Sequence, residues 1–341
     1  MYPLTEARAA TRAWNFHTTL YYKGVVPETS EMTFSSQLNF KLKRILVPLD
    51  FSAGSMKALD YAVSMAKQFH AALDLVHAYP SDEAWPGAGA RHLLFESAEA
   101  IERLNEKLTG IHREHIPTFP PENCHIRAGR PYEQIINLAR EINADLIVLS
   151  TRGYSGLKHL LLGSTAERVV RSAPCPVLVV RKRKPKSKAA SKSFAIRTIL
   201  VPVDFSTCSL AGTEYAAFLA RKLDATLRLF HAIYPYTNYA FVDRAGARLS
   251  GLAEAVEETA RQELDALKRM DFLQGLSVRI ETRPGPAVDE ICAAASDPDV
   301  DLIVTSSHGR TGMKHALIGS VAEHVVRYAE RPVLVVPSRH A

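Results

Sequence analysis

Short apolar runs alternate with longer amphipathic segments along most of this 341-residue chain. The run RILVPL at 44–49 is apolar at nearly every position, which is typical of a strand buried on both faces of a sheet. The segment from about Ser55 to Phe69 carries its apolar residues at helical spacing, so we expect a helix with one buried stripe. The other elements predicted for the first half are strands at 73–78, near His125, at 145–150 and at 177–180, and helices at about 93–115, 132–142 and from Thr165.

This order of elements occurs twice. Residues Asp145–Val180 and Asp301–Val336 align without a gap and are identical at 23 of 36 positions. Upstream, Asp50 corresponds to Asp204 at an offset of 154, against 156 in the aligned segments, so the second copy holds a net insertion of two residues. A nearly constant register with one small insertion is what tandem duplication leaves, so we expect two versions of one domain.

Four segments follow from the repeat. We predict an irregular N-terminal arm at 1–41, a first domain at 42–181, a basic linker at 182–195 and a second domain at 196–338. The linker lacks apolar periodicity and contains a proline, as expected of an exposed connection.

The alternation of strands and helices predicts the fold class. Parallel strands joined by helical crossovers give an α/β protein, here two tandem five-stranded parallel doubly wound sheets with helices on both faces. The strand order 2-1-3-4-5 and its relative 3-2-1-4-5 both place strand 1 beside the point where the winding reverses. Ligands of such sheets bind beyond the carboxyl ends of the strands at that point.

Composition narrows the class of protein. No run approaches the roughly 18–20 apolar residues of a membrane helix, and the N-terminal sequence has no apolar signal region, so we expect a cytoplasmic protein without a membrane partner. The four cysteines form no CxxC pair, which argues against a disulfide framework or a zinc site. The net charge of +6 arises from seven basic residues between Arg181 and Lys192. This stretch has no interleaved aromatic residues, so a nucleic-acid partner is not expected.

The glycine-bearing loop after strand 4 is the strongest local signal. Nine residues separate Gly153 from Gly163, and nine separate Gly309 from Gly319. Glycines let a backbone approach an anion closely, and the helix that follows offers free N–H groups and a favourable dipole. The sequences from Ser164 to Glu167 and from Ser320 to Glu323 also match the capping-box pattern, which would explain both serines by helix stability alone.

Other polar residues near the strand ends have two interpretations as well. Asp50 and Asp204 follow strand 1, where a carboxylate can accept hydrogen bonds from a ribose or cap the next helix, although Ser52 and Ser206 are available as caps. The histidines that end strand 2, His77 and His231, are typical of packed structural residues. Lys158-His159 and Lys314-His315 lie between the paired glycines and either neutralise phosphates or face solvent.

In combination these motifs resemble the universal stress protein family in its tandem form. The resemblance covers Leu42–Val180 and Ile196–Pro337 and rests on VPLD and VPVD after strand 1, VHA and FHA at strand 2, and G-x9-G-S before the last helix. It implies the strand order 3-2-1-4-5 and pairing of the two domains through their last strands, PVLVV in each copy. A homodimer of whole chains is compatible with it.

The resemblance also implies that the protein binds an adenine nucleotide, ATP or ADP, which can carry a bound Mg²⁺ ion. Family members that bind ATP carry G-x2-G-x9-G-(S/T), whereas this chain has Ser150 and Ser306 at the first glycine position. Asp50 and Asp204 would hold the ribose, and the backbone at Ala78 and Ala232 would contact the edge of the adenine. The glycine loops would hold the phosphates. The nucleotide-binding residues predicted in this way are Pro48, Asp50, Ala78, Gly153, Gly156, Gly163, Ser164 and Thr165 in the first domain and Pro202, Asp204, Ala232, Gly309, Gly312, Gly319, Ser320 and Val321 in the second.

Three functions are compatible with these residues. The leading hypothesis is a stress-response protein that binds ATP or ADP and acts as a nucleotide-dependent binding or signalling module. The second is a slow ATPase, although the sequence has neither a GxxxxGK[ST] loop nor a GxSxG elbow, and no catalytic residue can be named. The third is an interaction protein of the same fold that binds no nucleotide.

Overall fold

The structure is a computed structural model that describes residues 40–81, 98–120, 123–151, 162–181, 195–234, 246–309 and 318–338, without the side chains of 246–253. The predicted arm, apart from Phe40 and Lys41, and the basic linker, apart from Ala195, therefore lie outside the described residues. So do Lys158-His159 and Lys314-His315.

Each repeat alternates strands and helices as the sequence predicts. The first repeat consists of β1 (Arg44–Pro48), α2 (Ala53–Phe69), β2 (Ala72–Tyr79), α3 (Ala98–His115), β3 (Cys124–Ala128), α4 (Pro131–Glu141), β4 (Leu146–Ser150), α5 (Ser164–Ser172) and β5 (Val177–Val180). The second consists of β6 (Thr198–Pro202), α6 (Thr207–Leu223), β7 (Thr226–Ile233), α7 (Gly246–Lys268), the short 3₁₀ helix η6 (Asp271–Leu273), β8 (Val278–Pro284), α8 (Ala287–Ala295), β9 (Leu302–Ser306), α9 (Ser320–Tyr328) and β10 (Val333–Val336). The boundaries differ from the predicted ones by one or two residues, except that the predicted start of α3 near Leu93 lies outside the described residues.

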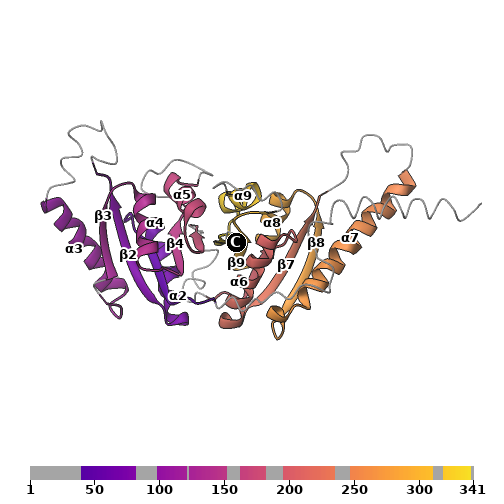
Figure 1. Ribbon diagram of the computed structural model, residues 1–341, viewed down its shortest axis with the longest axis horizontal. Helices are drawn as coiled ribbons and strands as arrows, with labels where there is room; N and C mark the ends of the chain where they lie inside the picture. Colours follow the sequence, from indigo (N-terminus) through magenta and orange to yellow (C-terminus); the bar gives the residue numbers. More distant parts are fainter. Residues whose placement is uncertain are drawn as a thin grey trace, which may run out of the picture.

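The ten strands within the described residues form one sheet in the order β3-β2-β1-β4-β5-β10-β9-β6-β7-β8. Within each repeat the strands are parallel and follow the order 3-2-1-4-5, which confirms the predicted fold. Figure 1 shows the repeats side by side, with α3 and α7 at the two far ends. The reversal of winding lies between β1 and β4, and between β6 and β9, so the chain has two candidate ligand positions.

The repeats meet where β5 and β10 pair antiparallel. Leu178 lies opposite Leu334, with Val177 opposite Val335 and Val179 opposite Val333. Because Leu178 and Leu334 are equivalent positions of the repeat, this register places a pseudo-twofold axis through that pair. The expected pairing of the two last strands is therefore observed, and each covers the apolar edge of the other.

Two apolar cores extend across this seam, one on each face of the sheet. Buried residues of α2, α3, α6 and α7 belong to one core, and buried residues of α4, α5, α8 and α9 belong to the other. Alternation along β1 supplies both, since Ile45 and Val47 face the first core and Leu46 faces the second. Among the described residues, no helix is long and apolar enough to cross a membrane.

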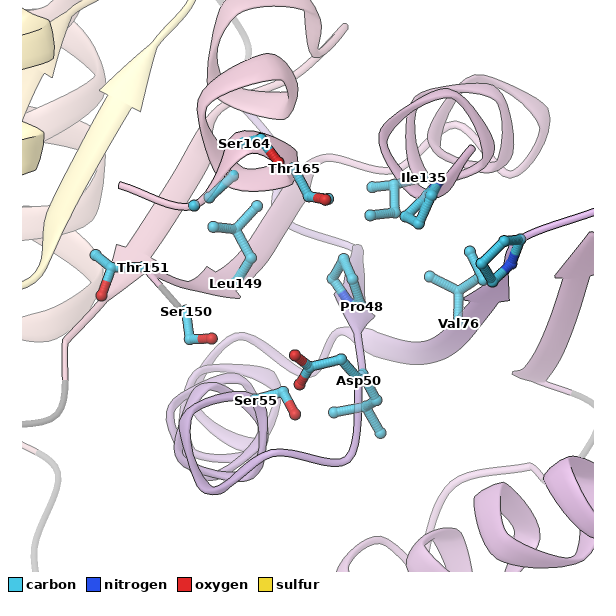
Figure 2. A pocket seen from close by; sticks show the side chains of 16 residues that line it. Pro48, Asp50, Ser55, Val76, Ile135, Leu149, Ser150, Thr151, Ser164 and Thr165 are labelled. Atoms are coloured by element: carbon cyan, nitrogen blue, oxygen red, sulfur yellow. The ribbon is translucent and has the colours of Figure 1, made fainter. Parts of the chain in front are cut away.

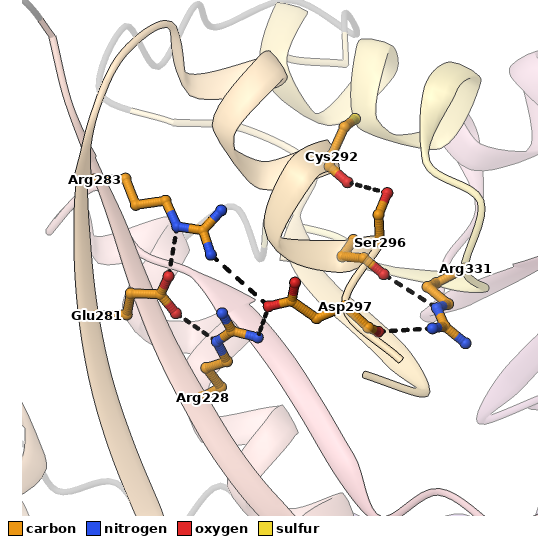
Figure 3. Close-up of polar contacts among 8 residues, drawn as sticks. Arg228, Glu281, Arg283, Cys292, Ser296, Asp297 and Arg331 are labelled. Atoms are coloured by element: carbon orange, nitrogen blue, oxygen red, sulfur yellow. Dashed lines mark hydrogen bonds and ion pairs between the residues drawn. The ribbon is translucent and has the colours of Figure 1, made fainter. Parts of the chain in front are cut away.

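A charged network supports the outer strands of the second repeat. Arg228 on β7 pairs with Glu281 on β8 and with Asp297 after α8, and Arg283 contacts the same two carboxylates (Figure 3). Burial alone would raise the pKa of Glu281, but the hydrogen bonds and charges of the two arginines outweigh burial and hold this pKa below its ordinary value. The Arg331 guanidinium caps the C-terminal end of α8 by donating hydrogen bonds to the carbonyl oxygens of Ala295 and Asp297.

The equivalent strands of the first repeat, β2 and β3, carry different side chains at these positions. Asp74 stands at the position of Arg228 and pairs with His125, which stands at the position of Glu281. An acidic residue thus stands on β2 where β7 carries a basic one, and the repeats have diverged in side chains while keeping the same backbone arrangement.

Candidate functional site

A cleft of about 490 Å³ opens at the carboxyl ends of β1 and β4. Asp50 and Pro48 come from the end of β1, Ser150 from the end of β4, and Ser164 from the first turn of α5 (Figure 2). Residues about 100 apart in the sequence therefore face one cavity, as the predicted strand order required.

The lining of this cleft changes in character from one end to the other. The β2 and α4 side is apolar, with Val76 and Ile135 at that end in Figure 2. In the view of Figure 2 the Asp50 carboxylate lies below the cavity near Ser55, and Ser164 and Thr165 lie above it on the first turn of α5. The cleft thus has an apolar wall, a hydrogen-bond acceptor and a helix N-terminus on different sides of one cavity.

The Asp50 carboxylate does not cap the next helix. Its Oδ1 accepts the Ser52 N–H at 3.0 Å, while the Ser52 hydroxyl oxygen is the cap of α2 and accepts the Ser55 N–H at 3.2 Å. Between them Phe51 has a φ of 62°, which a bulky residue adopts only when its surroundings hold it there. The sharp turn after β1 therefore orients Asp50 into the cleft instead of along the helix.

His77 holds that turn. Its Nδ1 lies 2.7 Å from the Leu49 carbonyl oxygen, so Nδ1 carries the proton and donates it, and the ring stacks on Phe51 at 4.4 Å. Burial lowers the pKa of His77, and this effect outweighs the hydrogen bond to Leu49 and the nearby Asp50 charge. The same bond, at 2.7 Å between His231 and Val203, recurs in the second repeat. The structural interpretation of both histidines agrees with these contacts.

The capping-box interpretation of the serines is wrong. Gly163 and Gly319 are the N-cap residues of α5 and α9, no side chain caps either helix, and Ser164 and Ser320 are already the first helical residues. The Gly163 N–H is bound to the Thr151 carbonyl oxygen at 2.8 Å, and a Cβ on Gly163 would lie 3.3 Å from that oxygen. Close packing of the loop against β4, not a left-handed backbone, therefore favours glycine here, and the Ser164 hydroxyl is left to line the cleft.

A second cleft of about 280 Å³ lies at the equivalent place between β6 and β9. Asp204 lines this cleft, and its Oδ1 accepts both the N–H and the hydroxyl of Ser206. A Cβ on Gly309 would lie 2.6 Å from Asp204 Oδ2, so the start of the glycine loop and the carboxylate are in direct apposition. Among the described residues, no group of three or more His, Cys, Asp or Glu side chains could form a metal site.

All of the predicted site residues that the structure describes line one of the two clefts. Gly153, Gly156 and Gly312 lie outside the described residues, and the nucleotide-binding role of the whole set stays a prediction. The first cleft contains Pro48, Asp50, Ala78, Gly163, Ser164 and Thr165, and the second contains Pro202, Asp204, Ala232, Gly309, Gly319, Ser320 and Val321.

Several lining residues were not predicted. Most of them are apolar residues of strands, or residues of α4 and α8, whose side chains reach the cleft only because those helices cross the ends of β2 and β7. Their sequence signal was their place at the carboxyl end of a strand or the first turns of the following helix. They include Val76, Pro80, Pro131, Ile135 and Leu149 in the first cleft and Phe230, Ala287, Ile291, Thr305 and His308 in the second.

Comparisons with known proteins agree with this architecture. Residues 41–181 and 195–337 each match the model of the universal stress protein family. A universal stress protein of Mycolicibacterium smegmatis is 28% identical over 305 residues, which cover 86% of this chain and 97% of that protein. Universal stress protein MJ0531 of Methanocaldococcus jannaschii is 34% identical over 144 residues, covering 42% of this chain and 84% of the relative.

A solved structure supports the fold over nearly the whole chain. The crystal structure of a universal stress protein from Archaeoglobus fulgidus aligns with a TM-score of 0.59 at 22% identity, covering 87% of this chain and 99% of that one. At this level of identity the similarity concerns the fold alone. Since the family model matches both repeats over most of their length, the chain belongs to the universal stress protein family and contains two tandem copies of its domain.

Proposed function

We propose that this stress protein binds an adenine nucleotide, ATP or ADP, in the cleft between β1 and β4, and that it acts as a nucleotide-dependent binding or signalling module. The observation that carries the proposal is the combination of groups around the first cleft. An apolar wall, a carboxylate and a helix N-terminus face one cavity, and they suit the base, the sugar and the phosphates of a nucleotide respectively.

Each part of the cleft has a stated role in the proposal. The wall formed by Val76, Ala78 and Ile135 packs against the base. Asp50 accepts hydrogen bonds from the ribose hydroxyls, a role that suits a carboxylate better than contact with a phosphate of the same charge. The choice of adenine over other bases rests on the resemblance of the sequence motifs to the family's ATP-binding members.

The phosphates lie at the first turn of α5 in this proposal. Unpaired N–H groups and the positive end of the helix dipole favour an anion there. The hydroxyls of Ser164 and Thr165 add donors at the same end. A Mg²⁺ ion that accompanies a triphosphate is bound chiefly through phosphate oxygens and water, as is usual for this ion.

The test is equilibrium titration with ADP and ATP, for example by calorimetry, on the full chain and on Asp50→Asn. The substitution keeps the shape but removes the charged acceptor, so we expect binding to weaken by roughly tenfold to a hundredfold. Asp60→Asn, an exposed position on α2, is the matched control and should bind as the unmodified protein does. Absence of saturable binding in correctly folded protein would refute the proposal.

A further inference from the structure

The two clefts of this chain are not equivalent. They occupy the same place in their repeats, yet the first has a volume of about 490 Å³ and the second about 280 Å³. Pockets that hold drug-sized ligands measure roughly 300–1,000 Å³, so only the first falls in that range.

One side-chain difference lies at the apolar end of the clefts. Val76 pairs with Pro48 in the first repeat, and Phe230 pairs with Pro202 at the same register in the second. Both side chains line their clefts from the core and each residue is only 1% exposed, so a phenyl ring lies beneath the surface of the second cleft where an isopropyl group lies beneath that of the first. The larger side chain of Phe230 reduces the space at the apolar end of the second cleft, which is the end that corresponds to the proposed position of the base.

The ring of Phe230 is held in place. Only 1% of the residue is exposed, and it belongs to the core formed with α8 and α9. The Arg283 guanidinium lies 5.9 Å from the ring centroid, within the range of a cation–π contact, and Arg283 is itself fixed by Glu281. Moving the ring aside for a base would disrupt this packing.

The rest of the second cleft differs in the same direction. Thr165 on the first turn of α5 is replaced by Val321 on α9, which removes a hydroxyl from the phosphate end. Asp204 Oδ1 accepts two hydrogen bonds from Ser206, and the backbone of Gly309 lies against Oδ2. Asp50 Oδ1 accepts the N–H of Ser52 in the same way, so the hydrogen bond from the Ser206 hydroxyl is the one that distinguishes the carboxylate of the second cleft.

We propose that the chain binds one nucleotide, in the first cleft, and that Phe230 is the residue that excludes a purine base from the second. The inference rests on the proposed function, since it assigns the nucleotide to one of the two clefts. Val76 and Phe230 are then the specificity-determining pair, and duplication has left one nucleotide site and one cleft too narrow for a purine base.

A reciprocal exchange tests this on the full chain, with ADP as the probe and calorimetry as the readout. The unmodified protein should bind one ADP per chain. Phe230→Val should open the second cleft and raise the stoichiometry toward two. Val76→Phe should fill the first cleft and weaken ADP binding by at least roughly tenfold, since overpacking of a formed cavity is unfavourable. Phe272→Val, which removes the same volume outside both clefts, is the control and should keep one site.

The outcomes separate the inference from the proposed function. Two ADP sites in the unmodified protein, or unchanged binding by Val76→Phe, would overturn the inference and leave the proposed function standing. Absence of binding in every protein would overturn both. If circular dichroism shows that Phe230→Val does not fold, Phe230→Leu replaces it, and a stoichiometry that stays at one in a folded variant counts against the role of Phe230.

Discussion

At the residue scale, the turn after β1 depends on a histidine whose charge state is set by burial. The pKa of His77 is lowered in the folded protein, whereas in the unfolded chain it lies near the ordinary value of about 6.5. Below that pH the unfolded state takes up more protons than the folded state. The free energy of unfolding therefore contains a contribution from His77 that decreases as the pH falls from neutral toward 5.

His77→Asn should remove this contribution, because an asparagine amide can still donate to the Leu49 carbonyl but does not titrate. We expect the unfolding free energy to depend less steeply on pH in the variant than in the unmodified protein, measured by urea unfolding at several pH values between 5.5 and 7.5. His70→Asn is the control, since His70 is exposed and its backbone has a left-handed φ of 53° that asparagine tolerates. Parallel pH profiles for His77→Asn and the unmodified protein would contradict the assignment.

Residues at strand ends were predictable, and residues that enter the cleft from a neighbouring element were not. Asp50 could be predicted as a site residue because a carboxylate that directly follows a buried parallel strand lies at the carboxyl edge of the sheet, where ligands bind. Ile135 could not, because an isoleucine on an amphipathic helix is expected in the core, and only the path of α4 across the end of β2 exposes it to the cavity. Phe230 belongs to the FHA motif, but its place beside the cleft was not predicted, since an aromatic residue in a buried strand is ordinary packing.

At the element scale, two serines that look alike in sequence have different tasks. Ser52 is the N-cap of α2 and its hydroxyl oxygen accepts the Ser55 N–H, whereas Ser164 is inside the first turn of α5 and caps nothing. The pattern S-x-x-E favoured a cap at Ser164. The structure begins the helix one residue earlier because Gly163 is tied to Thr151 of the loop after β4, a tertiary contact that no local pattern contains.

Alanine substitutions separate the two tasks. Ser52→Ala should destabilise the protein by about 1 kcal/mol, the usual cost of losing an N-cap, with the effect seen as a lower urea midpoint. Ser164→Ala should change the unfolding free energy by less than about 0.5 kcal/mol, as expected for a residue that caps nothing. It should nevertheless weaken nucleotide binding, which calorimetry would register. A stability loss at Ser164 equal to that at Ser52 would restore the capping explanation.

At the scale of the whole molecule, the seam turns two five-stranded sheets into one. Each repeat alone would expose the apolar edge of its last strand, VLVV in both copies, and the other repeat covers it. The sequence predicted both sheets, and its resemblance to the family implied that they pair through their last strands, whose apolar edges need covering. The sequence did not predict the antiparallel register, in which Leu178 lies opposite Leu334, the equivalent residue of the second repeat.

That symmetry makes a prediction about the isolated first repeat. Because β10 has the same sequence as β5, residues 40–181 expressed alone should form a homodimer in which β5 pairs with β5 of a second copy and Leu178 lies opposite Leu178. Sedimentation equilibrium should report the dimer. Val179→Lys should give a monomer, because a charge on an edge strand opposes pairing, and far-UV circular dichroism would verify that it stays folded. A monomeric first repeat without the substitution would mean that the covalent link between the repeats, and not the complementarity of their last strands, holds the ten-stranded sheet together.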